Sequence, residues 1–514
     1  MNSQVSAPSR WRARRWPRET LLWLALLPFL ISALLELRSP LDLSIGDQAQ
    51  YVLHARAILA GHAYTDDGYI YTSRVVISPK AYPPGLPLVI AGVEGLGAPL
   101  IVARLLMIAS AVLFLYWAGR YLMRLDDPVL GPAAILMCAF IPNLPLYATG
   151  LYSDFAFAAA AWGCCLLIDR PGRWSTERID RITALGAVAI AFRTAAVALI
   201  PALVLHQAWR TWRHREPWTR AVVPIVVWLS TYLVIDRLLP VTQSYAQQIV
   251  SGAADAGVGV GVGASAVAWI RILLQRAVSY QDFVSGIQLT PTPWRVVNLA
   301  YHAAALVALA IGAVAWVRRA GVRFLFCFTA CYVGIILLMP WTIGRFLWPL
   351  APMIWFATLD GARVVFQTVR MERVVAVRTA AVAAASIAIV AAVLGPAPPS
   401  LVGIGDLPEG RALYRALERE AASTPVRAMS SNPRDAALVP GVSAMSIPPS
   451  QPDSLLAAAD SYRITHAVLG SLGVDTSADR VLLETLQQHP ERFRRVYGND
   501  KFTLFRMVPA PSRE

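Results

Sequence analysis

Long apolar segments recur along the first 395 residues of the chain and then stop. Crossing a bilayer takes about 20 apolar residues. Candidate crossings lie at 20–37, 99–122, 129–148, 152–168, 219–238, 296–316, 323–340, 346–362 and 374–394. Beyond residue 395 the apolar runs are short and are separated by polar ones. The pattern predicts an α-helical polytopic membrane domain at 1–395, followed by a soluble domain at 396–514.

One more apolar stretch, Ile182–Leu205, lies between two basic loops, 169–181 and 207–220. A single crossing would place these loops on opposite sides, although basic loops are retained in the cytoplasm. Two short helices that run out and back would keep both inside, with the turn near Arg193 and Thr194. We therefore expect a hairpin of half-length helices, giving about eleven crossings. Its turn must be buried in protein or line a water-filled cavity.

Charge along the chain predicts the orientation. Arg-rich short segments hold 22 cations; they are the N-terminus, 119–128, 169–181, 207–220, 317–323 and 363–378. The longer loops 38–84 and 239–294 and the short loop 341–345 together hold seven. The positive-inside rule then places the N-terminus in the cytoplasm and the C-terminal domain outside a bacterial inner membrane. We read the basic start and first apolar run as an uncleaved helix.

Composition excludes a soluble globular enzyme, because 56% of residues are hydrophobic and 15% are charged, where soluble proteins have roughly a quarter charged. The net charge of +14 comes from residues 1–395, since 396–514 holds 13 residues of each sign. No nucleic-acid-binding module accompanies this charge. The five cysteines lie inside apolar segments, which argues against disulfides and zinc spacing.

The C-terminal 119 residues have the pattern of a small α/β domain. Strand-like runs at Val426–Met429, His466–Leu469 and Phe502–Met507 alternate with helical patterns at Arg411–Ala421 and Ala478–Gln488. A proline-rich linker at 396–399 precedes them. No nucleophile elbow, phosphate loop or metal spacing is present, so we expect an accessory domain.

Polar chemistry concentrates in the first outer loop, 38–84. The segment Asp47–Gly61 is expected to be a helix on the membrane surface. Its apolar face comprises Tyr51, Val52, Ala55, Ile58 and Leu59, with Gln48, His54 and Arg56 elsewhere. Asp47 stands at its start, where a carboxylate serves as an N-cap or as a general base. Both roles are compatible. A second surface helix is expected at Ala264–Phe283, after a glycine-rich stretch, either as an element that closes over a bound ligand or as a passive amphipathic anchor.

The rest of this loop supplies further candidates. Asp66 or Asp67 could hold a structural metal together with His54 and His62. Arg74, Lys80 and Tyr82 follow, just before Pro83-Pro84. Lys80 is one of only two lysines in the chain, and a compact ammonium suits a phosphate oxygen. The alternative is that Lys80 has been retained by chance at an exposed loop position and has no role in binding.

These residues resemble a known family. The runs GDQAQYVLHARAILAGHAYTDD and SPKAYPPGLPLVIA are similar to the first outer loop of C-type glycosyltransferases, which use polyprenyl-phosphate sugars. Members include relatives of protein O-mannosyltransferase and aminoarabinose transferase. Tyr152-Ser153-Asp154, AFRTAAVALIPAL at 191–203, GRFLWPLAPMI at 344–354 and NDKFTLFRM at 499–507 extend the resemblance. The usual Lys-Pro-Pro reads here as Lys80-Ala81-Tyr82-Pro83-Pro84.

The resemblance implies a function and roles for these residues. Asp47 would be the catalytic base. Lys80, Arg74, Arg193 and Arg345 would contact the donor phosphate, and Asp154, Tyr82, Asp66 and Asp67 would serve the acceptor or the donor. Asp154 as a helix cap, Arg193 as a ligand of loose carbonyls and Arg345 as a snorkelling side chain remain alternatives.

The implied reaction moves a monosaccharide from a polyprenyl-phosphate donor to a hydroxyl or amine of a lipid, glycan or protein at the outer face, with inversion. The resemblance implies no definite cofactor, and a divalent metal stays open. A transporter or flippase for lipid-linked sugars is the competing class, although its ionisable groups would lie near the midplane. A third class is a binding or assembly scaffold in which the C-terminal domain carries the function.

Overall fold

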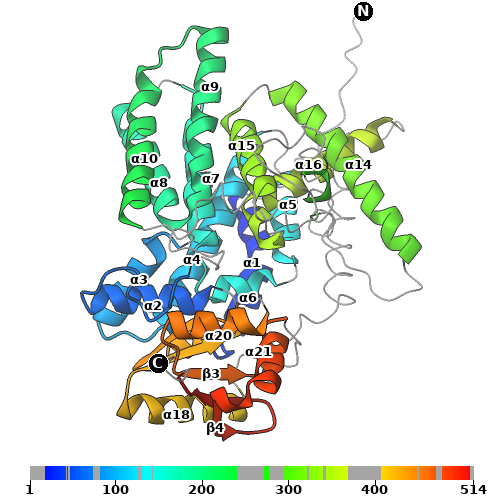
Figure 1. Cartoon of the computed structure of the whole chain (residues 1–514). Coiled ribbons are helices and arrows are strands. Elements are labelled where there is room, and N and C mark those ends of the chain that lie inside the picture. Colours follow the sequence, from blue (N-terminus) through cyan, green and yellow to red (C-terminus); the bar gives the residue numbers. More distant parts are fainter. Residues whose placement is uncertain are drawn as a thin grey trace, which may run out of the picture.

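The structure is a computed structural model that is mostly helical, with one five-stranded sheet near the C-terminus (Figure 1). It describes residues 18–41, 43, 47–72, 82–125, 129–141, 143–172, 174–239, 271, 273–276, 280, 295–320, 323–339, 343–368, 375, 407–448, 451–470 and 477–509. All but one residue of the predicted segment at 374–394, the linker at 396–399 and most of the predicted surface helix at 264–283 lie outside these residues.

Helices of the apolar part follow the predicted segments closely. They are α1 (Arg18–Glu36), α2 (Gln48–Leu59), α3 (Gly85–Gly95), α4 (Ile101–Leu122), α5 (Leu130–Ala139), α6 (Leu144–Thr149), α7 (Asp154–Ile168), α8 (Thr176–Phe192), α9 (Leu199–His214), α10 (Thr219–Leu238), α14 (Arg295–Ala320), α15 (Phe324–Leu338) and α16 (Ala351–Thr368). Among the described residues, three helices are long and apolar enough to cross a membrane, at Glu19–Glu36, Ile101–Leu122 and Thr219–Leu238. Several shorter apolar helices accompany them.

The predicted hairpin is present. Helix α8 ends at Phe192, Arg193 is extended at φ −153°, and the 3-10 turn η2 (Thr194–Ala198) leads into α9. The prediction of half-length helices is wrong, since α8 has 17 residues and α9 has 16. Both continue beyond the apolar stretch into flanks rich in Arg, which is a good helix former.

The predicted single span at 129–148 is also wrong. Helix α5 stops at Ala139, and α6 begins only after Asn143, whose φ of 65° is left-handed. A left-handed residue cannot continue an α-helix, and Pro145 fixes the start of α6. The segment is therefore two short helices, and the second leads to the beginning of α7.

Helix α2 is not the amphipathic surface helix that the sequence predicts. Its polar Gln48, Gln50 and His54 are as buried as its apolar residues. One side packs against α3, in a core that includes Tyr82. The other side contributes Leu53 to the core of the C-terminal sheet and its helices. The helix is thus enclosed between two layers of protein.

The C-terminal part, here called the tail, is a mixed sheet covered by helices. Its strands are β1 (Val426–Ser430), β2 (Val442–Ser446), β3 (His466–Leu469), β4 (Phe493–Gly498) and β5 (Thr503–Met507), in the order β2-β1-β3-β5-β4. Strands β2, β1 and β3 are parallel, whereas β5 is antiparallel to β3 and β4. Its helices are α18 (Pro408–Ser423), α19 (Pro433–Ala437), α20 (Pro452–Ser461) and α21 (Ser477–Gln488). The three predicted strands and two predicted helices are confirmed, while β2, β4, α19 and α20 were not predicted.

The first loop is joined to the edge of this sheet. Tyr69 forms a parallel bridge with Ala444 of β2. Ala444 N donates to Gly68 O at 2.8 Å, and Ile70 N donates to Ala444 O at 2.7 Å. Gly68 has φ +84°, a conformation that favours glycine. Backbone hydrogen bonds therefore fix the loop that follows α2 to the tail.

Candidate active site

A cavity of about 200 Å³ opens where five parts of the chain meet. These parts are the start of α2, the segment just before α3, the hairpin turn after α8, the end of α15 and the 3-10 turn η4 (Gly344–Leu350). The lining residues are Asp47, Tyr51, Tyr82, Arg193, Thr194, Ala195, Tyr332, Ile335, Ile336, Met339, Ile343, Arg345 and Phe346. The lining combines charged and aromatic groups with the aliphatic side chains of Ile335, Ile336, Met339 and Ile343. Such a mixture suits a ligand with a polar head and an apolar chain.

Asp47 carries the only carboxylate among the cavity residues of the described chain, and its oxygens have three partners. Arg345 Nη2 donates to Oδ2 in a close ion pair. Tyr82 Oη donates to Oδ1 at 3.0 Å, and Arg434 Nη1 approaches the same oxygen at 3.2 Å. Asp47 occupies the N-cap position of α2 but makes no capping hydrogen bond with its side chain. The N-cap interpretation of this carboxylate is therefore wrong.

The two guanidinium groups set the acidity of Asp47. Burial alone would raise its pKa, but the charges of Arg345 and Arg434 and the hydrogen bonds from Arg345 and Tyr82 lower it to about 2. The carboxylate is therefore ionised at neutral pH. A carboxylate held at so low a pKa accepts protons poorly until one of its cations is drawn away.

The second acidic position, Asp154, pairs with the hairpin arginine. Arg193 Nη1 lies 2.8 Å from Asp154 Oδ1, and the Asp154 side chain is 2% exposed. Neither carboxylate oxygen accepts a hydrogen bond within the described part of the chain, so the helix-cap interpretation of Asp154 is wrong. The ion pair instead fixes the turn between α8 and α9 to the start of α7.

Aromatic rings lie against the guanidinium groups of Arg193 and Arg345, the two arginines that line the cavity. Arg345 lies over the Tyr152 ring at 5.1 Å, and Arg193 lies over the Phe346 ring at 5.0 Å. Arg434 lies over Tyr82 at 5.5 Å. Rings in these positions orient a guanidinium without neutralising it. Two positive charges, those of Arg345 and Arg434, therefore converge on Asp47, while Arg193 lines the same cavity and is paired with Asp154.

The fold is shared with two solved proteins. ArnT from Cupriavidus metallidurans in the apo state superposes with a TM-score of 0.50 at 14% identity, over 95% of this chain and 97% of ArnT. The archaeal oligosaccharyltransferase AglB from Archaeoglobus fulgidus, in complex with an inhibitory peptide and a dolichol-phosphate, superposes with 0.54 at 13% identity, over 90% and 70%. This chain has their fold. At the level of sequence, neither a family model nor a curated protein matches it.

The resemblance drawn from the loop motifs is thereby confirmed at the level of the fold. Together with the apolar helices, the shared fold indicates a membrane protein. The ArnT-like fold brings Asp47, Tyr82, Arg193, Asp154 and Arg345 to one place, although they are spread over 299 positions of the sequence. Arg74 and Lys80 lie outside the described residues.

Asp66 and Asp67 have different surroundings in the structure. Asp66 is exposed and does not line the cavity. The Asp67 carboxylate is fully buried, 3.0 Å from His54 Nδ1. It also accepts hydrogen bonds from Gln50 Nε2 and, at 3.1 Å, from Tyr71 Oη. This polar network holds the loop against α2.

The same network bears on the metal alternative. Within the described residues, no three His, Cys, Asp or Glu side chains are grouped so that they could hold a metal ion. His54 and Asp67 do meet, but His62 is exposed and the Asp67 oxygens are occupied by hydrogen bonds from Gln50, Tyr71 and the Tyr69 backbone. The donor set does not fit a metal centre.

Arg434 is the site residue that the sequence did not reveal. It lies in α19 of the tail, 387 positions from Asp47, in a stretch that reads as an ordinary polar turn. Pro433 starts this short helix, and α19 packs against α2 and β2. Arg434 could have been found from the sequence only if docking of the tail on α2 had been predicted.

The pair of Asp154 and Arg193 gives a stability prediction. Asp154→Asn or Arg193→Gln alone leaves a buried charge without its partner, so each should cost at least about 1–3 kcal/mol. The double substitution should cost less than the two single losses added together, because neither charge remains. Thermal unfolding of the purified protein in detergent measures all three. Additive losses would show that the two side chains do not interact.

Proposed function

We propose that this protein is a membrane glycosyltransferase that moves a monosaccharide from a polyprenyl-phosphate donor to a hydroxyl or amine acceptor, with inversion. The observation that carries the proposal is the cavity in which the ionised Asp47 meets Arg345 and Arg434, beside the pair of Arg193 and Asp154. The shared fold supports it, and AglB was solved with a dolichol-phosphate, a lipid phosphate of the proposed donor class.

The reaction needs one base and a stabilised leaving group. The acceptor O–H or N–H gives its proton to an Asp47 oxygen while the acceptor atom attacks the anomeric carbon. The bond from that carbon to the phosphate oxygen breaks, and its electron pair leaves with the lipid phosphate. Arg193 and Arg345 stabilise the charge that develops there. A single displacement inverts the anomeric centre, and unlike a glycosidase it does not require two opposed carboxylates.

Donor binding would also activate the base. In this structure, Arg345 is committed to Asp47, and the pKa of the carboxylate is lowered to about 2. A lipid phosphate in the cavity competes for the same guanidinium, and Arg binds phosphate with two parallel hydrogen bonds. Weakening the ion pair raises the pKa of Asp47 and frees an oxygen for the acceptor. Lys80 and Arg74 remain proposed phosphate contacts from the adjoining loop.

Asp154, Tyr82, Asp66 and Asp67 remain proposed contributors to the acceptor or donor site. Tyr82 is the most direct, since it touches Asp47. Asp154 would act through Arg193, whose position it fixes. Asp67 would act through the loop that carries Tyr71. Asp66, being exposed, would meet only a large acceptor that covers the loop.

For the arrangement in the membrane, we propose about eleven crossings in residues 1–395, a cytoplasmic N-terminus and an extracytoplasmic domain at 396–514. The outward side is then the side of Asp47 and the tail. Basic loops at the opposite helix ends support this orientation.

Cysteine labelling tests the orientation. Asp66→Cys and Asp453→Cys should react with a membrane-impermeant thiol reagent added to intact cells, whereas Arg181→Cys should react only after the membrane is opened. These positions are exposed. The native cysteines are buried or half-buried, so the wild-type protein provides the blank. Labelling of Arg181→Cys in intact cells would invert the proposed topology.

The function itself is tested by two measurements. Mass spectrometry of cell-envelope glycans, with and without the protein, should show one sugar missing from one acceptor. The purified protein in vesicles should then transfer labelled sugar from a polyprenyl-phosphate donor to that acceptor. Movement of the intact donor across the bilayer without transfer would support the flippase alternative instead.

A further inference from the structure

A second cavity lies at the opposite end of α7 from the candidate active site. Helix α7 begins with Asp154 and ends at Ile168, a length of about 22 Å for 15 residues. Beyond its end is a cavity of about 380 Å³. Its lining residues are Tyr121, Arg124, Leu125, Leu166, Asp169, Arg170, Pro171 and Arg323. The volume far exceeds the roughly 10–15 Å³ that one water needs.

Asp169, the one acidic side chain in this lining, is already committed to the fold. Its oxygens accept hydrogen bonds from Phe324 N at 2.9 Å, Leu325 N at 3.3 Å and Tyr121 Oη at 2.7 Å. The carboxylate therefore caps α15 and links it to α4 and α7. Three arginines against one carboxylate leave the lining positive.

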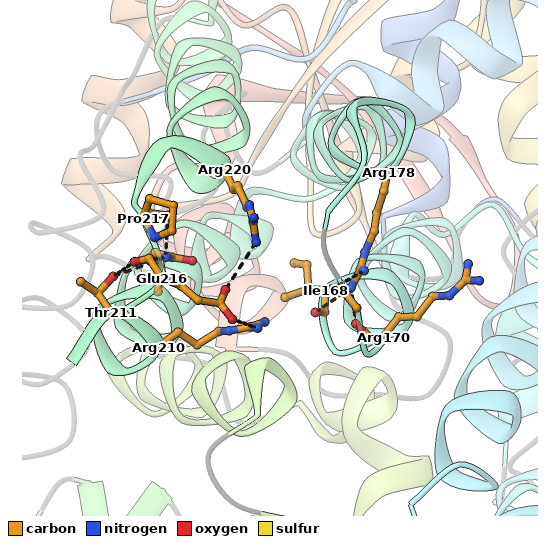
Figure 2. Close-up of polar contacts among 10 residues, drawn as sticks. Ile168, Arg170, Arg178, Arg210, Thr211, Glu216, Pro217 and Arg220 are labelled. Carbon is orange, nitrogen blue, oxygen red and sulfur yellow. Dashed lines mark hydrogen bonds and ion pairs between the residues drawn. The ribbon is translucent and has the colours of Figure 1, made fainter. Parts of the chain in front are cut away.

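Other arginines at this end of the helices have partners, as Figure 2 shows. Arg178 donates to backbone carbonyls, among them Leu167 O at 2.8 Å and Ile168 O at 3.2 Å. Arg210 and Arg220 share the carboxylate of Glu216. These three are structural, because each satisfies acceptors of the protein itself.

The cavity arginines differ. The guanidinium of Arg170 points away from the Arg178 contacts and carries no dashed line in Figure 2. Within the described chain neither Arg170 nor Arg323 forms an ion pair, and the buried Nε of Arg323 has no hydrogen-bond partner. Among the described residues, the guanidinium of Arg124 has one long hydrogen bond, to Leu166 O at 3.5 Å. A buried donor without a partner is costly, and a bound anion would satisfy it.

The positive charge around this cavity also lowers the pKa of one of its own arginines. Burial lowers the pKa of Arg124, and the neighbouring charges of Arg120 and Arg170 lower it further, against the smaller opposing effect of Glu19. Guanidinium groups therefore crowd one another at the cavity. An anion placed between them would relieve this repulsion.

We propose that this cavity binds a phosphate group through Arg124, Arg170 and Arg323. Guanidinium forks match phosphate oxygens in geometry and charge, and Leu125, Leu166 and Pro171 supply an apolar wall. The phosphate comes either from the headgroup of an anionic phospholipid in the adjacent leaflet or from a soluble phosphate. Basic pockets between membrane helices bind such headgroups. The inference is independent of the catalytic proposal.

Native mass spectrometry of the full-length protein, released from detergent, tests the site. One arm supplies phosphatidylglycerol, a second supplies inorganic phosphate, and phosphatidylcholine serves as the zwitterionic comparison. Arg124→Gln and Arg323→Gln should each weaken binding of the anionic ligand, phosphatidylglycerol or inorganic phosphate, about tenfold. This is the effect expected for the loss of one charge-assisted hydrogen bond. Arg124→Lys should weaken it less, since the charge remains.

Arg181→Gln is the matched control. This substitution also removes one arginine, near the start of α8, but Arg181 is exposed and paired with Glu177. Binding of the anionic ligand should therefore be unchanged. Selective binding in the lipid arm identifies a headgroup site, and binding in the phosphate arm identifies a soluble ligand. Equal losses in Arg181→Gln and Arg323→Gln, or no preference for either ligand over phosphatidylcholine, would overturn the proposal. Arg170→Gln, in a loop, provides a third variant if Arg323→Gln does not fold.

Discussion

Replacing Asp47 by Asn should reduce sugar transfer by roughly a thousandfold or more, because a positioned general base contributes about 10²–10⁴ and the amide cannot accept the acceptor proton. The amide also leaves Arg345 and Arg434 without their shared counter-charge. These arginines would then be free to hold the donor phosphate more tightly. Transfer from labelled donor in vesicles is the measurement, and donor binding should persist or increase.

Glu94→Gln is the control for Asp47→Asn. Glu94 lies in the last turn of the neighbouring helix α3, with its carboxylate 3.8 Å from Arg56 Nε. Its replacement therefore also removes an ion-paired carboxylate, but one outside the cavity. Its transfer rate should stay within about twofold of wild type, as expected for a weak surface ion pair. Normal transfer by Asp47→Asn, with normal expression, would remove the proposed base.

Much of the helical architecture could be predicted because membrane helices are defined by length and polarity. Apolar runs with basic flanks located α1, α4, α7 and α10 to within a few residues. The hairpin at Arg193 followed from charge alone, since both its flanks were too basic to lie on opposite sides. Helix ends were less predictable, because Arg-rich flanks continue a helix as well as apolar residues do.

Contacts between distant segments could not be predicted. The buried polar face of α2 reads as a surface face, because nothing in its own sequence shows that the tail covers it. The bridge between Tyr69 and Ala444 joins a loop to a strand that was itself not predicted. Arg434 reaches Asp47 only through this docking. Family motifs identified the residues of the membrane part, but the tail's contribution required the three-dimensional arrangement.

Replacing Arg434 by Gln should lower transfer by about a hundredfold, even though Arg434 belongs to the tail. It contacts Asp47 Oδ1 and lies over the ring of Tyr82, which holds the same oxygen. Loss of this support lets the carboxylate move, and a small displacement at a reacting group can cost about 10² in rate. Arg506→Gln is the control, because Arg506 is a tail arginine paired with Glu420 away from the cavity.

The pH dependence separates a role at the base from a merely structural one. Arg345 and Arg434 lower the pKa of Asp47 to about 2, so in wild type the carboxylate stays ionised, and its ion pairs stabilise the fold, until the pH falls through that value. Removing one cation raises the pKa, so in Arg434→Gln the acid limb of kcat/KM should move to higher pH. Arg434→Lys, which keeps the charge, should restore most of the shift. If Arg434→Gln lost activity equally at every pH, the tail would support the fold of the site without acting on its carboxylate.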